Sequence, residues 1–312
     1  MTIATRFFFP AFLALAFSAP AATAESRDEL RFWLENMVWY HDYTLDEMAL
    51  ATKLPNAQIE RALKEFGISR ATRPERKPDA PLLVLPYPGG RHPRIGFLDG
   101  AVNPMRGTKF SVFLPWPNSG HVVIDVPEAI WANGQLIFLA HTHIPTVWDK
   151  QGIPLPDIEW TRKPGGELES RRKLPDGVEY RVRVVPRRES VDMELSITNG
   201  SDAPLTKLRA QNCVMLKGAP DFNGQTGDNK VKIDEIVAVR SKDGARWITT
   251  AWDYGKPWEN PLVPCMHSDP NFPDCPPGET VVSRGRILFY EGKDIQAEIE
   301  RLRKEKNLHW KP

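Results

Sequence analysis

Residues 191–205 read Val191-Asp-Met-Glu-Leu-Ser-Ile-Thr-Asn199-Gly-Ser-Asp-Ala-Pro-Leu205, a strand pattern that runs into a turn. Apolar and polar residues alternate up to Thr198, and a period of two is typical of a β-strand. The residue types that follow, Asn, Gly, Ser, Asp and Pro, are those that form turns. The preceding segment, Tyr180-Arg-Val-Arg-Val-Val185, alternates in the same way. We therefore expect neighbouring strands that each keep one face solvated.

The same pattern extends over residues 82–292. Turns rich in Gly, Pro, Asn and Asp separate ten apolar strand candidates, at residues 82–85, 110–116, 121–126, 135–143, 178–185, 191–198, 205–216, 231–239, 246–250 and 280–290. The chain also has 29 prolines in 312 residues, which disfavours long helices. These features predict a mainly β protein built on a large antiparallel β-sandwich, of the supersandwich type.

Residues 25–69 show helical signals instead and predict a small N-terminal helical subdomain. The signals are two capping boxes, a further capping residue and a terminating glycine: Ser26 with Glu29, Thr44 with Glu47, Asn56, and Gly67. The spacing resembles a helix-turn-helix, but we interpret the segment as a cap docked on the main domain. Residues 70–81, with three prolines and six charges, have the composition of a linker. Residues 293–312 predict a C-terminal amphipathic helix and tail.

The first 24 residues are typical of a secretory signal peptide. They contain Arg6, an apolar run over residues 7–19 and Ala22-Thr23-Ala24, which fits a cleavage site. The run is shorter than the roughly 20 residues that span a bilayer, so no stable membrane span is expected. We predict a periplasmic or secreted protein after cleavage near Ala24. An oxidising compartment favours a disulfide between Cys265 and Cys275. Cys213 is then interpreted as a buried structural thiol, and a Cys-rich metal site is not expected.

Charge and motifs exclude several classes of function. The chain has 41 Lys and Arg against 40 Asp and Glu, a formal charge of +1, which produces no field suited to nucleic acid. The sequence holds no Gly-x-Ser-x-Gly elbow, Walker loop, Rossmann fingerprint or His-Glu-x-x-His motif. Serine hydrolase, nucleotide-binding and zincin functions therefore have no support.

His141 and His143 form a His-x-His pair at the end of an apolar strand candidate. Positions i and i+2 of a strand share a face, so the two imidazoles are placed to bind one divalent metal ion. Further candidate ligands are acidic residues and a histidine: Asp149, Glu159, His267 and Asp269. The alternative is a pair of histidines that bond nearby groups without a metal.

Other polar and aromatic residues suit a ligand site. The proline-rich loop over residues 261–277 carries His267 and Asp269, and is either the wall of a ligand site or a structural loop. Asparagine in an apolar strand needs a hydrogen-bond partner, and aromatic rings stack on sugars. The candidate substrate-binding residues are Asn212, Lys217, Trp148 and Asp269.

Residues 189–216, with the turn Pro277-Gly-Glu-Thr280 before the last strand, resemble the galactose mutarotase-like superfamily. The resemblance implies a β-supersandwich and a carbohydrate ligand, without choosing among hydrolase, lyase and epimerase reactions. Epimerases of that superfamily use a histidine as acid and a glutamate as base. By position, the resemblance implies His143 and Glu159 in these roles, with His267 as a further catalytic candidate.

The sequence also resembles the cupins, through Gly134, His141, His143 and Asp149. Three hypotheses for function follow. The first is an exported carbohydrate-active enzyme with a histidine-centred site that holds or lacks one divalent metal ion. The second is a non-catalytic carbohydrate-binding or envelope-binding protein. The third is a cupin-like metalloprotein.

Overall fold

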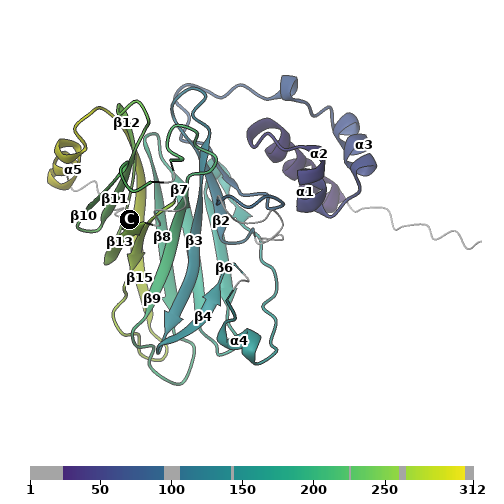
Figure 1. The fold of residues 1–312 in the computed structure, drawn as a ribbon. Helices are drawn as coiled ribbons and strands as arrows, with labels where there is room; N and C mark the ends of the chain where they lie inside the picture. The colour runs from purple at the N-terminus through teal and green to yellow at the C-terminus, as the bar shows by residue number, and fades with distance from the viewer. Residues whose placement is uncertain (1–23, 95–105, 142–143, 225, 260–264, 306–312) are drawn as a thin grey trace, which may run out of the picture.

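The computed structural model describes residues 24–94, 106–141, 144–224, 226–259 and 265–305 (Figure 1). Two antiparallel sheets form a sandwich. One has seven strands in the order β1-β2-β3-β9-β14-β13, with β4 paired to β3. The other has eight strands in the order β10-β11-β12-β15-β8-β7-β6-β5. The prediction of a mainly β protein with a large antiparallel sandwich is confirmed.

The seven-stranded sheet consists of β1 (Val84–Pro86), β2 (Lys109–Phe113), β3 (His121–Ala132), β4 (Gln135–Leu139), β9 (Arg209–Met215), β13 (Gly255–Glu259) and β14 (Cys265–Pro270). The eight-stranded sheet consists of β5 (Thr161–Arg162), β6 (Leu168–Lys173), β7 (Glu179–Pro186), β8 (Ser190–Thr198), β10 (Lys230–Ile233), β11 (Ile236–Arg240), β12 (Arg246–Trp252) and β15 (Thr280–Glu291). One hydrophobic core, contributed by both sheets, fills the space between them.

Alternation along the strands explains this core. Val191, Met193, Leu195 and Ile197 of β8 are fully buried and belong to the core between the sheets. Successive side chains of a strand point to opposite faces, so the intervening polar residues lie on the outer face of the eight-stranded sheet. The pattern that predicts the strand therefore also fixes which face packs inward.

One strand prediction and one loop prediction are corrected by the structure. The candidate over residues 231–239 is a hairpin of β10 and β11, because Asp234 adopts a left-handed φ of 51° between them. Part of the segment predicted as a loop, residues 261–277, forms strand β14, which pairs with β9 and β13. Its sequence, Cys-Met-His-Ser-Asp-Pro, lacks β-branched residues and ends in proline, so its strand conformation depends on the two neighbouring strands.

The N-terminal helices are α1 (Ala24–Glu35), η1 (Asn36–Tyr40), α2 (Leu45–Thr52) and α3 (Asn56–Phe66), with their own small core. The Thr44–Glu47 capping box is present, and Gly67 ends α3 with a φ of 66°. Ser26 lies inside α1 rather than at its cap, and Pro55 takes the cap position expected for Asn56. The remaining helical segments are η2 (Arg70–Thr72), α4 (Val147–Lys150), η3 (Pro164–Gly166) and α5 (Ile295–Lys304).

The helical subdomain docks beside β1 and β2 at one end of the sandwich (Figure 1). Asn36 donates to the carbonyl of Pro86 at 2.9 Å, and His41 Nε2 lies 2.7 Å from the hydroxyl of Ser111 on β2. Tyr43 donates to the carbonyl of Gly89 at 2.7 Å. Buried polar contacts of this kind fix the orientation of a docked element. The subdomain therefore covers the outer face of the seven-stranded sheet near β2.

The predicted disulfide between Cys265 and Cys275 is wrong, because neither cysteine forms a disulfide in the structure. Cys265 begins β14, and Cys275 follows that strand and packs in the core between the sheets. A strand rises about 3.3 Å per residue, so six extended residues carry the two thiols apart. Residues 1–23 of the predicted signal peptide lie outside the described residues. The helices in the described ranges include none with the length and apolar character of a membrane span.

Gly285 permits close packing across β15 and β12. A Cβ at this position would lie 2.3 Å from the indole ring of the buried Trp252 on the neighbouring strand. We expect Gly285→Ala to lower the free energy of unfolding by about 1–3 kcal/mol through overpacking, measured by urea denaturation. Gly227→Ala is the control, because a Cβ there meets nothing within 4 Å. Equal stability of both variants would contradict this packing.

Candidate functional site

A row of chemically active side chains crosses the outer face of the seven-stranded sheet. Residues directly opposite one another on β2, β3, β9, β14 and β13 are, in order, Lys109, Asp125, Cys213, His267 and Trp258. Their strand neighbours Phe110, Ile124, Val214 and Met266 pack in the core. Alternation therefore places the row on the face directed away from the other sheet.

Residues 87–94 cross this outer face and bury part of it. The backbone N–H of Tyr87 donates to the carbonyl of Lys109. His92 stacks on His141, with ring centroids 5.1 Å apart. Lys217, just beyond the end of β9, donates from Nζ to the carbonyl of His92 at 3.0 Å. This segment, together with the docked helices, turns a sheet surface into an enclosed polar site.

Lys109 and Asp125 form a fully buried ion pair, with Nζ 2.9 Å from Oδ2 and both side chains 0% exposed. Burying two charges costs several kcal/mol per ion unless each is well compensated. A fully buried ion pair on the outer face of a sheet is therefore unusual for residues that have only a structural role. Asp125 Oδ2 also lies 3.4 Å from Nε2 of His141, which links the pair to the next group.

His141, Glu128 and Arg94 form the centre of the site. Nε2 of His141 lies 3.1 Å from Oε1 of Glu128, and the guanidinium of Arg94 donates to the same oxygen at 2.6 Å. The second carboxylate oxygen of Glu128 accepts from Gln211 at 2.9 Å. Glu128 is on β3 beyond the irregular register between Asp125 and Ala129. His141 thus faces two carboxylates, with two cations close by.

The surroundings set the charge states of this centre. Burial, together with the charge of Lys109, lowers the pKa of His141, although Glu128 and Asp125 act in the opposite direction. Burial alone would raise the pKa of Glu128, but His141 and Arg94 together lower it by more than burial raises it, so its pKa lies well below the usual range. Burial and neighbouring positive charges also lower the pKa of His92 to about 3. At neutral pH, His141 is therefore a neutral imidazole beside an ionised carboxylate.

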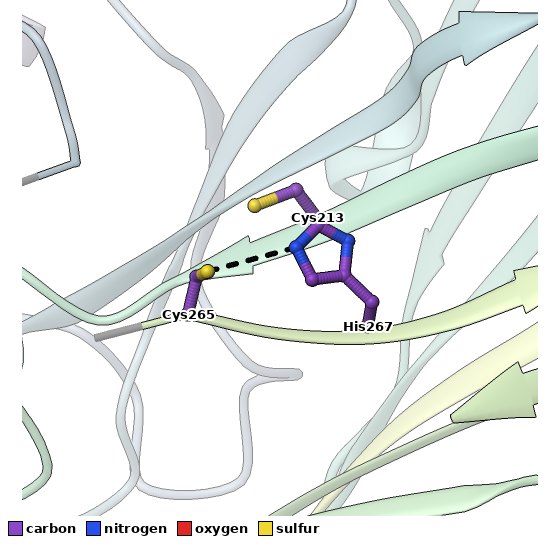
Figure 2. A group of neighbouring side chains, drawn as sticks. All are labelled: Cys213, Cys265 and His267. Carbon is purple, nitrogen blue, oxygen red and sulfur yellow. Dashed lines mark hydrogen bonds between the residues drawn. The ribbon is translucent and has the colours of Figure 1, made fainter. Parts of the chain in front are cut away.

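Next to this centre, β9 and β14 bring together two thiols and an imidazole (Figure 2). Cys265 Sγ lies 3.6 Å from Nε2 of His267, and the ligand atoms of Cys213, Cys265 and His267 all lie within 4.8 Å of one another. Burial lowers the pKa of His267, but Cys213 and Asp269 raise it more, to about 10. Burial also raises the pKa of the Cys213 thiol.

A pocket of about 210 Å³ adjoins the centre through His92. Its walls combine basic, aromatic and small residues: Tyr87, Arg91, His92, Pro93, His121, Val123, Lys217 and Gly218. Burial and the charge of Arg91 lower the pKa of His121 to about 4. Arg91 is held by Glu47 of α2 at 3.1 Å. The helical subdomain therefore positions one wall residue of this pocket, Arg91.

The structure brings some of the predicted residues to this face. His141, His267, Lys217 and Asp269 lie on or beside it, and His143 is outside the described residues. Glu159 pairs with Arg106 at 2.8 Å, and its side chain is 46% exposed. Asp149 forms the N-terminal capping box of α4 together with the N-cap residue Thr146. Within the described part of the chain, neither carboxylate joins a group of three metal-ligating side chains.

Two predicted substrate-binding residues lie away from this face. Trp148 is buried in the core and donates from Nε1 to the carbonyl of Ile137 at 2.7 Å. Asn212 is 3% exposed and alternates with the outward-facing Cys213, so its side chain points into the sandwich. Gln211, which has the opposite orientation, is the amide that reaches the site.

Four residues of the site are not singled out by any sequence pattern described above: Glu128, Arg94, Lys109 and Asp125. A signal for two of them is present in residues 121–132, His-Val-Val-Ile-Asp-Val-Pro-Glu-Ala-Ile-Trp-Ala, where two carboxylates interrupt an apolar strand. Acidic residues are rarely fully buried unless paired. Their partners come from β2 and the 87–94 segment, and no local pattern connects these to β3.

No family model matches the chain, and no curated protein matches its sequence. A solved structure described as a kojibiose phosphorylase from the human microbiome matches 60% of this chain and 26% of that chain, with 7% identity and a TM-score of 0.37. A galactose mutarotase related enzyme from Lactobacillus acidophilus matches 60% of this chain and 96% of its own, with 8% identity and a TM-score of 0.31. A heparan sulfate lyase mutant from Pedobacter heparinus matches 86% and 47%, with 9% identity and a TM-score of 0.38.

Proposed function

We propose that the chain is an exported carbohydrate-active enzyme whose active site is the outer face of the seven-stranded sheet, beneath residues 87–94. The observation that supports this most directly is the buried centre of His141, Glu128 and Arg94, next to the Lys109–Asp125 pair. Clusters of buried, interacting ionisable groups with displaced pKa values are concentrated at functional sites.

The chemistry that fits is proton transfer by His141. A neutral imidazole accepts a proton, and the ionised carboxylate of Glu128 stabilises the imidazolium that forms. Arg94 and Lys109 place positive charge close to His141, and such charge would stabilise an oxyanion that develops on a substrate there. These groups are fixed before the substrate binds, so little reorganisation opposes the reaction.

This arrangement favours an epimerase or lyase reaction over hydrolysis. Glycoside hydrolysis generally uses two carboxyl groups on opposite sides of the scissile bond. Here the carboxylates of Asp125 and Glu128 both face one imidazole, which suits one base rather than two flanking acids. Abstraction of a proton from a sugar carbon or hydroxyl is the step that epimerases and lyases share.

An aromatic side chain at the end of the row across the outer face suits a saccharide. Trp258 on β13 is 38% exposed, and one face of its indole ring stacks on His267. Aromatic rings present an apolar face to the C–H bonds of a sugar while polar groups bind the hydroxyls. The pocket of about 210 Å³ has the size of a single sugar unit, and its Lys217 suits a saccharide with an acidic group.

The test is a screen of the purified full chain against neutral and uronic acid saccharides. Reducing ends, unsaturated products and anomeric exchange are followed by NMR spectroscopy. Turnover of at least one saccharide is expected, with a several-fold higher KM for Trp258→Ala at similar kcat, because stacking contributes to binding. Binding without turnover would instead identify a non-catalytic carbohydrate-binding protein. The proposal would be refuted if no saccharide of the panel is bound or turned over.

A further inference from the structure

The pairing of β9 with β14 creates a group of metal-ligating side chains outside the proton-transfer centre. Cys213 is directly opposite His267, and Cys265 lies two residues before His267 on the same face of β14. All three side chains are fully buried. We propose that Cys213, Cys265 and His267 bind one Zn²⁺ ion. This site differs from the His141–His143 site that the sequence predicts, and it does not depend on the proposed carbohydrate activity.

The spacing of the ligand atoms fits a tetrahedral ion. Zn–S distances of about 2.3 Å and Zn–N distances of about 2.1 Å set tetrahedral edges of about 3.6 Å between sulfur and nitrogen. The observed distance from Cys265 Sγ to His267 Nε2 is 3.6 Å. The thiol of Cys213 completes a triangle with every edge within 4.8 Å. One ion at the centre therefore reaches all three atoms with only small side-chain adjustments.

A disulfide between Cys213 and Cys265 is the competing interpretation of two neighbouring thiols. Because Cys213 is opposite His267, the two cysteines are diagonal neighbours across β9 and β14. Diagonal positions in an antiparallel pair are about 7–8 Å apart, whereas disulfides need Cα atoms about 4.4–6.8 Å apart. A disulfide between these cysteines would therefore require the two strands to shift, whereas binding of one Zn²⁺ ion would leave the strands in place.

The groups around His267 fix its ring in the orientation that a metal ligand requires. Nδ1 faces Oδ1 of Asp269 at 3.6 Å, leaving Nε2 directed at the thiols. Metal-bound histidines commonly have a carboxylate on the other ring nitrogen, which fixes tautomer and orientation. Asp269 is itself fixed by the backbone N–H of Asn212 at 3.0 Å and by the indole of Trp258. Trp258 also stacks on the imidazole, with centroids 3.9 Å apart.

The ligand set and the local charge favour zinc. Thiolate and imidazole ligands together select zinc or copper over the hard ions Mg²⁺ and Ca²⁺. Zinc binding displaces the protons of the two thiols and of His267 Nε2. Two thiolates, a neutral imidazole and Zn²⁺ then make a neutral complex, which lowers the cost of burial. The guanidinium of Arg94 lies 3.3 Å from Cys213 Sγ and provides a further hydrogen bond to the sulfur. Three protein ligands leave one tetrahedral position for water or substrate, as in catalytic zinc sites.

The experiment measures zinc directly in the full chain, purified under reducing conditions without chelator. Mass spectrometry of metals is expected to give about one zinc per chain, and X-ray absorption about two sulfur neighbours near 2.3 Å. Cys213→Ser and Cys265→Ser should each reduce bound zinc at least tenfold. Cys275→Ser should retain it, because this third free thiol packs in the core between the sheets.

Wild-type protein that retains no zinc after incubation with Zn²⁺ and dialysis would overturn the proposal. Zinc bound without sulfur neighbours would overturn it equally, and this readout holds even if the serine variants do not fold. Loss of zinc from Cys275→Ser as well, with folding intact by circular dichroism, would also contradict the assigned ligands.

Discussion

Lys109→Met is expected to lower the free energy of unfolding by about 3–5 kcal/mol, because it leaves the buried carboxylate of Asp125 without its cation. Both side chains are 0% exposed, and Nζ lies 2.9 Å from Oδ2. Methionine approximates the length and shape of lysine, so loss of charge rather than a cavity dominates. Urea denaturation followed by circular dichroism measures the change.

The double variant Lys109→Met with Asp125→Leu separates charge from packing. Replacing a whole buried ion pair by apolar residues is often neutral or stabilising, so the double variant should recover most of the lost stability. If Lys109→Met is as stable as the wild type, the prediction is wrong, because Asp125 is then not left as an unpaired buried carboxylate. A double variant no more stable than the single one would assign the loss to packing.

The fold is predictable where one strand contains its own signal. β8 alternates through Val191, Met193, Leu195 and Ile197, and all four side chains are buried in the core. β14 has no such signal, since Cys265–Pro270 contains only one residue of strong apolar character, Met266. Its conformation comes from pairing with β9 and β13, an interaction with residues far away in the sequence.

The same distinction explains the candidate site. The sequence predicts His141 because a His-x-His pair ends an apolar strand candidate, and His267 because it lies with Asp269 in a proline-rich segment. It does not predict the partners, since Glu128 and Arg94 meet only when the 87–94 segment crosses the outer face. A Cys-rich metal site is likewise not expected from the sequence, because Cys213 is distant from Cys265 along the chain. Antiparallel pairing of β9 with β14 brings the two cysteines close together in space. This pairing is a tertiary contact that no local sequence pattern indicates.

Glu128→Gln is expected to lower kcat by about 10²–10⁴-fold on the saccharide that the screen identifies, a typical effect of losing an acid–base partner. Glutamine keeps the shape of the side chain but removes the charge that stabilises protonated His141. The pH profile gives a second readout. Because burial and Lys109 lower the pKa of His141, the wild-type rate should fall with acid only below the ordinary histidine value of about 6.5.

The direction in which the pH profile shifts distinguishes an electrostatic effect of Glu128 on His141 from a purely structural role. The Glu128 carboxylate raises the pKa of His141, so its removal should move the acid limb of the profile to lower pH. Asp192→Asn is the matched control, since Asp192 is a buried carboxylate paired with Arg187 and Arg286 on the opposite sheet. This control should lose stability while kcat and the pH profile stay unchanged. If Glu159→Gln abolishes turnover and Glu128→Gln does not, the base is the one that the sequence resemblance implies.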